Sequence, residues 1–231
     1  MKKMVDLIII ILLLIFALVG YAAGLIKTLV TLTGSIVALM ISFIVYPIVN
    51  MILKATAVYT MIYNGVFSKV QGIDFGKGIQ AQGQAITQNI TWLPRFLTEQ
   101  IAENNNAKMY DLLGVHTLIE YISTYITDMI IGLLAILITW FLIKVVLVGV
   151  LGSVSKLVEH LPIISELNHL GGFIIGLFKG VLTVCIITLI IPAFLSIPSL
   201  MNLGFLLQSS YLIQWFYEHN LLIWIYNTLI Y

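Results

Sequence analysis

The chain has 231 residues, of which 61% are hydrophobic and only 9% are charged, and its net charge is +1. Soluble domains carry about 25% charged residues, so this composition argues against an ordinary soluble protein and predicts that lipid solvates much of the chain. A net charge close to zero argues against a nucleic-acid partner, because such proteins usually present a basic face. The single cysteine, Cys185, cannot form an intramolecular disulfide and leaves the redox compartment open.

Residues 1–53 predict a transmembrane hairpin. Residues 7–26 contain no charged side chain, and such a run of 20 residues is long enough to span a membrane. A second uncharged run, residues 28–53, follows almost at once, with Lys27 at the expected turn. Pro47 lies late in this run and is expected to end or kink the helix. The alternative for the start of the chain is a signal peptide, since two lysines precede an apolar stretch.

Residues 54–128 predict an extramembrane insert with short helices. Acidic and basic side chains are balanced there, and glutamine, asparagine and glycine are frequent. One short helix is expected near residues 94–103. Thr117 and Glu120 have the spacing of a capping box, in which each side chain accepts a hydrogen bond from the backbone N–H of the other residue. This motif predicts the start of a second helix.

Residues 129–192 predict a second transmembrane hairpin. Its first span covers residues 129–151, and its second is the apolar run 170–191, which Pro192 and Pro198 are expected to close. Residues 193–231 are apolar but interrupted by polar side chains, which predicts an amphipathic tail of interfacial helices, with a fifth span as the alternative. The aromatic residues typical of an interface are Trp215, Tyr217, Trp224 and Tyr226.

The predicted fold is therefore an all-α, polytopic helical integral membrane protein. It has four transmembrane helices, a polar insert between the second and the third, and interfacial C-terminal helices. Four alternating spans put both termini and the insert on the same side of the membrane. Lysines near the span ends number four on the opposite side and three on the insert side, which favours an outward-facing insert and cytoplasmic turns. The four are Lys27, Lys144, Lys156 and Lys179, and the three are Lys2, Lys3 and Lys54.

Glycines recur at helical spacing in the first and fourth spans. Positions four residues apart lie on one helix face, and a face of small residues lets another backbone approach closely in lipid. We therefore expect the glycine faces of the first and fourth spans to pack together, with Lys27 and Lys179 at a common level on the cytoplasmic side. The candidate packing residues are Gly20, Gly24, Gly34, Gly172, Gly176 and Gly180.

Charged side chains in or beside the spans are the sharpest candidates for function. They are Asp6, Lys27, Lys144 and Lys179. A lysine deep in a span costs roughly 2.5–3.5 kcal/mol on insertion scales. One interpretation is an anion or lipid-headgroup site, or a gate, in which Lys179 acts with the other two lysines. The other is that its amine snorkels to the nearby interface.

Motifs for catalysis or metal binding are weak. Glu166 and His169 have the E-x-x-H spacing of diiron bundles, but the spans lack the further carboxylates, so polar caps at a helix start are the simpler interpretation. Ser153 and Lys156 match S-x-x-K without its companion motifs. We therefore predict no catalytic residue, no metal site and no cofactor, and a protein that is not an enzyme.

Three groups of residues resemble motifs of the colicin V production protein (CvpA) family. Near its start that family has an aspartate, an apolar helix, a glycine with a base three residues later, and another glycine, as in Asp6, residues 7–23, Gly24, Lys27 and Gly34. Before its last span it has a polar residue, spaced glycines and a base–glycine pair, as in Asn168, Gly172, Gly176, Lys179 and Gly180. Residues 210–215 resemble the tail of the family.

The chain also departs from the family pattern. It has Ala23 where the family often has arginine, Thr28 where an acid is common, and a longer insert. The resemblance implies a bacterial multi-pass protein of the cytoplasmic membrane with a role in colicin V (toxin) production or secretion and in envelope processes. The partners predicted are the lipid bilayer and either a second copy of the chain or another envelope protein. The alternatives are a small channel or transporter that uses the intramembrane lysines, and a membrane scaffold that binds a partner through the insert.

Overall fold

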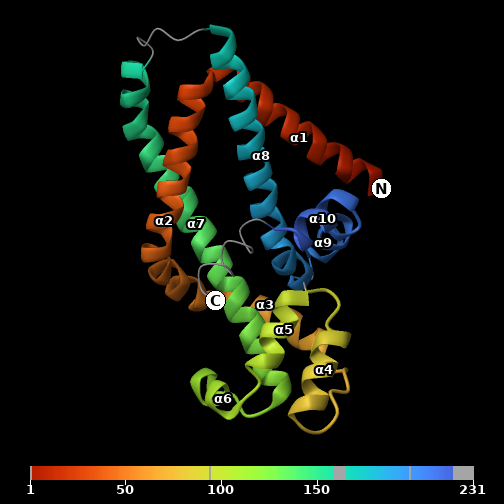
Figure 1. Cartoon of the computed structure of the whole chain (residues 1–231). Coiled ribbons are helices and arrows are strands. Elements are labelled where there is room, and N and C mark those ends of the chain that lie inside the picture. Colours follow the sequence, from red (N-terminus) through yellow and green to blue (C-terminus); the bar gives the residue numbers. More distant parts are fainter. Residues whose placement is uncertain (1, 94, 159–164, 198, 221–231) are drawn as a thin grey trace. The chain divides into compact units, whose positions relative to one another are not determined.

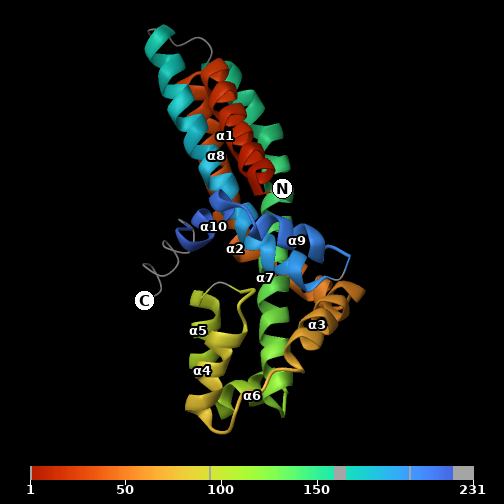
Figure 2. The same cartoon turned by 90° about the vertical axis from the view of Figure 1, so that its right-hand side faces the viewer.

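The computed structural model describes residues 2–93, 95–158, 165–197 and 199–220, and all the regular structure in these residues is α-helical. The all-α prediction is confirmed. The helices in chain order (Figures 1 and 2) are α1 (Lys2–Ala23), α2 (Leu25–Lys54), α3 (Ala57–Val70), α4 (Ile79–Asn89), α5 (Arg95–Glu103), α6 (Ala107–Leu113), α7 (Leu118–Val158), α8 (Ser165–Ser196), α9 (Met201–Gln208) and α10 (Tyr211–Glu218).

Four of these helices, α1, α2, α7 and α8, are long and apolar enough to cross a membrane, as predicted. In the most apolar window of each, only 11–33% of the residues are buried within the protein. Apolar side chains that lie outside a protein core are stabilised by another apolar surrounding, and lipid provides one. The four helices therefore indicate a multi-pass membrane protein.

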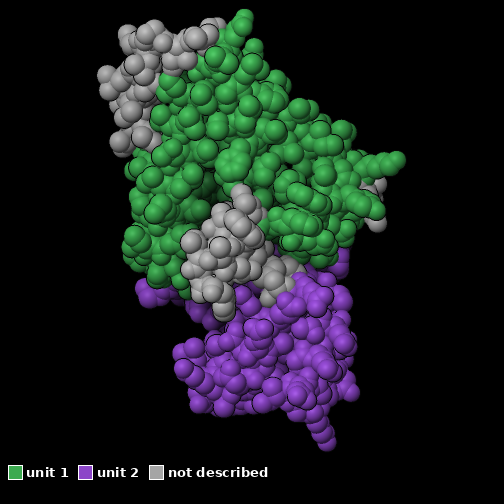
Figure 3. Space-filling view, viewed as in Figure 1, with its two compact units in different colours: residues 1–50, 134–189, 206–231 green, residues 51–133, 190–205 purple. Residues whose placement is uncertain are grey.

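The described chain divides into two compact units, which Figure 3 shows in different colours. Unit 1 consists of residues 1–50, 134–189 and 206–231, and unit 2 consists of residues 51–133 and 190–205. Four of the described helices contribute residues to both units: α2, α7, α8 and α9. Each unit therefore combines segments that are distant in the sequence.

In unit 1, a single residue, Gly24, separates α1 from α2. Its φ of +79° lies in the left-handed region that favours glycine. The Thr28 hydroxyl donates to the Gly24 carbonyl at 2.7 Å and lies 3.3 Å from the carbonyl oxygen of Gly20, so it joins the two helices across the turn. The turn was expected at Lys27, which instead lies in the first turn of α2, because Gly24 alone can change the chain direction.

The outer surface of unit 1 is apolar. Side chains with large exposed fractions occur along α1 from Met4 to Tyr21 and along α2 from Leu29 to Ile48. They occur also in α7, from Ile138 to Val146, and in α8, from Leu167 to Phe178. This surface is expected to contact lipid, because water would solvate it poorly.

Two prolines lie within helices rather than at their ends. Pro47 is in α2, and Pro192 is in α8, which continues to Ser196. Pro192 therefore does not close the fourth helix, which ends two residues before Pro198, the other proline expected to close it. Proline removes one backbone donor, but the helix continues because its last turn is packed in unit 2. Leu195 is fully buried there, and the Ser196 hydroxyl donates to the Pro192 carbonyl at 2.8 Å.

Unit 2 has an apolar core of its own. Helices α3, α4, α5 and α7 contribute side chains with almost no exposed surface, and so does the end of α8. The largest of them are Ile62, Ile86, Ile90, Ile101, Tyr121, Ile122, Ile126, Ile130, Ile131, Ile191 and Leu195. Unit 2 contains the predicted insert, residues 54–128, together with residues 51–53, 129–133 and 190–205. The extramembrane placement of the insert stays a prediction.

The predicted capping box begins a much longer helix than expected. Glu120 accepts from the backbone N–H groups of His116 (2.9 Å) and Thr117 (3.1 Å), and the Thr117 hydroxyl accepts from the Glu120 N–H (3.2 Å). The helix that starts there is α7, and its 41 residues include the predicted third span. It continues without a break because no glycine or proline lies between the box and residue 129.

The C-terminal region contains the short helices α9 and α10. The Ser210 hydroxyl caps α10 by accepting from the N–H of Ile213 at 3.1 Å. Ile213 and Phe216 are buried, whereas Tyr211 and Trp215 are exposed, so α10 is amphipathic. Residues 221–231 lie outside the described part of the chain, and with them Trp224, Tyr226 and the end of the alternative fifth span.

We predict that Thr117→Ala lowers the free energy of unfolding by about 1 kcal/mol, because α7 loses its N-cap acceptor. Thermal unfolding in detergent, followed by circular dichroism, measures the change. Thr87→Ala is the control, because the Thr87 hydroxyl donates to carbonyls within α4 and caps no helix. We expect its effect to stay within about 0.5 kcal/mol. Equal losses for both variants would contradict a capping role for Thr117.

Candidate functional site

Helices α1 and α8 of unit 1 approach each other closely through glycine. A Cβ atom on Gly20 would collide with the carbonyl oxygen of Gly172 and would lie 2.8 Å from the Cα of Gly176. A Cβ atom on Gly176 would collide with the Phe16 carbonyl and would lie 3.0 Å from the Cα of Gly20. The obstacles are backbone atoms, which cannot rotate away. Only glycine therefore fits at these positions, and the two backbones are in direct contact.

The polar residue before the spaced glycines, Asn168, joins α8 to the turn between α1 and α2. Its side-chain Oδ1 accepts from the backbone N–H of Leu25 at 2.9 Å. This N–H belongs to the first turn of α2, where it has no partner within the helix. The side-chain nitrogen of Asn168 occupies the space that a Cβ on Gly24 would need. Asn168 therefore caps a helix that is more than 140 residues away in the sequence.

The remaining candidate glycines have different surroundings. Gly24 is the turn itself rather than part of a helix face. A Cβ on Gly180 would lie 3.1 Å from side-chain atoms of Leu13 and Phe16, which are able to shift. Gly34 is buried in α2. The glycine positions therefore differ in how strictly the structure requires them, and those in direct backbone contact are the most restricted.

His169 packs on α1 next to Asn168. Its Nδ1 lies 2.6 Å from the carbonyl oxygen of Tyr21. The centroids of the His169 and Tyr21 rings are 5.1 Å apart, and the ring planes are tilted by 35°. A carbonyl oxygen only accepts, so Nδ1 carries the hydrogen. In the E-x-x-H pattern, this histidine therefore makes a contact between helices, and Glu166 is exposed. Among the described residues, no group of three histidine, cysteine or carboxylate side chains could hold a metal ion. Glu159 and His160, which lie near this pattern in the sequence, are outside those residues.

Asp6 joins the start of α1 to the start of α10. Its Oδ1 accepts from the Ser210 hydroxyl at 2.6 Å and from the Leu212 backbone N–H at 3.0 Å. A carboxylate at a helix N-terminus is stabilised by the unpaired N–H groups and the helix dipole. The same serine caps α10. Asp6 therefore binds both the capping side chain and a backbone N–H of the helix.

Two lysines of the spans lie close to α2. Lys179 of α8 donates to the Thr31 hydroxyl at 3.3 Å. Lys144 of α7 lies over the ring of Trp140, with its Nζ 4.6 Å from the ring centroid. The indole N–H of Trp140 donates to the backbone carbonyl of Ser35 at 2.9 Å. One turn of α2, with Thr31 and Ser35, therefore contacts both lysine-bearing helices.

The third lysine expected at this level, Lys27, is exposed in the first turn of α2. It lies four residues before Thr31, the residue that the Lys179 amine contacts. Four residues correspond to about 6 Å along a helix. The structure therefore places Lys27 about one helical turn nearer to Gly24 than this contact. The side chain of Lys156 lies outside the described part of the chain.

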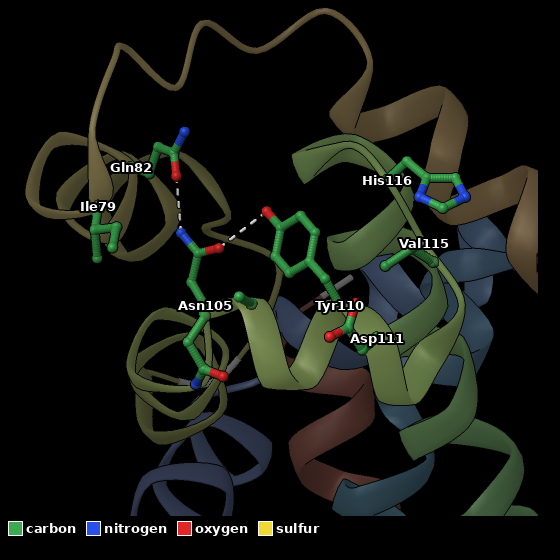
Figure 4. Close-up of a pocket in the computed structure, with 9 residues that line it drawn as sticks. Ile79, Gln82, Asn105, Tyr110, Asp111, Val115 and His116 are labelled. Atoms are coloured by element: carbon green, nitrogen blue, oxygen red, sulfur yellow. Dashed lines mark hydrogen bonds between the residues drawn. The ribbon is translucent and has the colours of Figure 1, made fainter.

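Unit 2 contains a chain of three polar side chains beside an open pocket of about 420 Å³. Asn105 donates through Nδ2 to Gln82 (2.9 Å) and accepts through Oδ1 from the hydroxyl of Tyr110 (3.0 Å), as Figure 4 shows. Burial raises the pKa of Tyr110, so its hydroxyl remains a donor at neutral pH. The three groups satisfy one another, and this wall of the pocket therefore stabilises unit 2.

An ion pair also lies in unit 2. The Lys54 amine is 2.9 Å from Asp128 Oδ2. Burial and the nearby Asp128 carboxylate together raise the pKa of Tyr59 to about 12. Tyr59 therefore stays neutral beside the carboxylate at physiological pH. Tyr59 of α3 and Asp128 of α7 form a structural contact between these two helices.

Several residues at these contacts were not identified as site residues from the sequence. They are Thr31, Ser35, Trp140, Asn168, His169 and Ser210. Trp140 and Lys144 are four residues apart, and this spacing alone could have predicted a cation–π pair on one helix face. The partners of Thr31, Asn168 and Ser210 lie far away in the sequence, and no local pattern identifies them.

Comparison with known proteins adds no relative: no family model, curated protein or solved structure matches this chain. The class of the protein therefore follows from its own helices. It is a helical protein with four candidate membrane spans.

We predict that Gly176→Ala destabilises the protein by about 1–3 kcal/mol, because the added methyl group collides with backbone atoms of α1. The measurement is the unfolding transition in detergent. Gly132→Ala is the matched control, since a Cβ on this helical glycine meets no atom within 4 Å. Alanine there should be neutral or stabilising by up to about 1 kcal/mol. Similar transitions for the two variants would show that α1 and α8 do not approach closely at Gly176.

Proposed function

We propose that the chain is a multi-pass protein of the bacterial cytoplasmic membrane, that it belongs to the CvpA family, and that it supports colicin V (toxin) production or secretion and envelope processes without catalysing a reaction. One observation supports this proposal. The residues that carry the resemblance are those through which the segments of unit 1 contact one another, although they are distant in the sequence.

Each matched group has a partner in another group. Asp6, from the first group, binds Ser210 and Leu212 in the tail that resembles that of the family. Gly24, also from the first group, lies against Asn168 of the second. If the three motifs maintain one fold, we expect their residues to contact one another, as these residues do. The match of three weak motifs is therefore supported by the contacts among them.

A non-enzymatic role is supported by what these polar side chains bind. Asn168 and Asp6 both accept from backbone N–H groups. Such contacts hold helices together and leave the two side chains engaged in the fold. The role that fits is that of an accessory protein, which positions its helices and unit 2 for other components of the envelope.

The interfacial placement of α10 is part of the proposal. Tyr211 and Trp215 are exposed on this helix, with 80% and 53% of their surfaces accessible. Aromatic rings with a polar tip are enriched at the boundary between lipid and water. Asp6 anchors the helix to the start of α1, which is where the first span is expected to leave the membrane.

Complementation tests the proposed function. In a bacterium that makes colicin V but lacks its own CvpA-family protein, this chain should restore toxin release, measured by killing of sensitive cells. Gly132→Ala should restore it equally, whereas Gly176→Val and Asp6→Ala should restore less at equal membrane levels, because each breaks a contact of unit 1. Absence of restoration by the unaltered chain, where the host protein does restore release, would contradict the proposed function.

We also propose that unit 2 faces away from the cytoplasm. With the buried Cys185 replaced by serine, single cysteines at Gln80 in α4 and Ala22 in α1 report the two sides, since both residues are exposed and uncharged. A maleimide that cannot cross the cytoplasmic membrane should label Gln80→Cys in spheroplasts, and Ala22→Cys only after lysis. The reverse pattern would place unit 2 in the cytoplasm.

A further inference from the structure

Lys144 and Lys179 both lie beside one turn of α2 in unit 1. Lys179 contacts Thr31, and the indole over which Lys144 lies contacts Ser35, four residues later on α2. Four residues correspond to about 6 Å along a helix. Beside the same turn of α2, the two ammonium groups are like charges that repel each other.

Helix α2 holds the two amines in place. Thr31 accepts from Lys179, and its own hydroxyl donates to the carbonyl of Thr28, so its position is fixed. One turn later, the carbonyl of Ser35 fixes the indole of Trp140, over which Lys144 lies. Thr31 and Trp140 are therefore positioning residues for the two lysines.

The surroundings of this pair are apolar and open to lipid. Several residues near Lys144 on α7 are exposed, among them Phe141 and Val146, with 62% and 67% of their surfaces accessible. Phe178, next to Lys179, is exposed as well. Both lysines are half-buried. The amines therefore lie at the wall of the helix bundle, where a ligand can reach them from the membrane.

Snorkelling does not account for both amines. The Lys179 amine is held by the Thr31 hydroxyl, and the Lys144 amine lies over the face of the Trp140 ring. Both amines are thus engaged by groups of unit 1 and are not extended along their helices toward an interface.

The charge of the pair is not balanced within the described part of unit 1. The ion pairs among the described residues, Lys54–Asp128 and Arg95–Glu99, lie in unit 2. Two ammonium ions next to lipid are costly unless an anion accompanies them. Each ammonium has three N–H donors, of which Lys179 uses one on Thr31. Several donors remain for a ligand with more than one acceptor oxygen.

We propose that Lys144 and Lys179 form a binding site for a phosphate group, with Thr31 and Trp140 holding the two amines. A phosphate fits because its oxygen atoms can accept from both lysines at once, and its negative charge offsets their repulsion. The group can belong to an anionic phospholipid that enters from the surrounding bilayer, or it can be inorganic phosphate. The site is independent of the role in toxin release proposed above.

Binding to the purified full chain in a neutral detergent tests the site. Phosphatidylglycerol is titrated and bound copies are counted by native mass spectrometry, with phosphatidylcholine as the uncharged-headgroup reference. Inorganic phosphate is tested separately by thermal stabilisation, with chloride at the same ionic strength as the reference. We expect Lys144→Gln and Lys179→Gln each to weaken binding about fivefold, and the double variant to weaken it about twenty-five-fold.

The control is Lys77→Gln, which removes the same charge from an exposed loop of unit 2 and should bind like the unaltered chain. The double variant should fold, because it removes two charges from an apolar surface. Its circular dichroism spectrum checks this point, and Lys179→Arg, which keeps the charge, should retain binding. Loss of phosphatidylglycerol binding alone identifies a lipid site, and loss of phosphate binding alone identifies a site for the free anion.

Two results would overturn the proposal. One is that neither probe binds the unaltered chain more strongly than its reference. The other is that the double variant binds as well as the unaltered chain, or no more weakly than Lys77→Gln.

Discussion

Direct contact between the backbones of α1 and α8 is the constraint on which unit 1 depends. Gly20, Gly172 and Gly176 leave no room for a Cβ atom between the two helices. In lipid, helices gain little from burying apolar side chains against one another, because the acyl chains are equally apolar. Close packing of small residues and interhelical hydrogen bonds are what remain, and this pair of helices uses both.

The hydrogen bonds of unit 1 lie at the ends of that contact. Asn168 and His169 bind backbone groups of the α1–α2 turn, and Asp6 binds the start of α10 at the other end of α1. In each case a polar side chain meets a backbone group that its own helix leaves unpaired or exposed. These contacts define which helices are neighbours, whereas the glycines define how close they come.

Unit 2 follows a different physical rule. Its core consists of isoleucine, leucine and tyrosine side chains with no exposed surface, as in a soluble domain. The hydroxyl of Tyr121, buried in this core, donates to the carbonyl of Ile101 at 2.8 Å, which satisfies the one polar group that the ring brings inside. One chain thus combines a unit with apolar side chains on its outer surface and a unit with apolar side chains inside.

The sequence by itself determined the helical class, the four long apolar helices, the capping box at Thr117 and Glu120, and the spacing of the glycines. Each of these follows from composition or from a period within one segment, which local backbone geometry translates directly into structure. Only the tertiary structure decided that α8 continues through Pro192, that residues 190–205 join unit 2, and that Asp6 binds Ser210. It also decided that Lys144 and Lys179 lie beside one turn of α2. These outcomes depend on contacts between segments far apart in the chain, whose packing can outweigh a local signal such as a proline and leaves no period in the sequence.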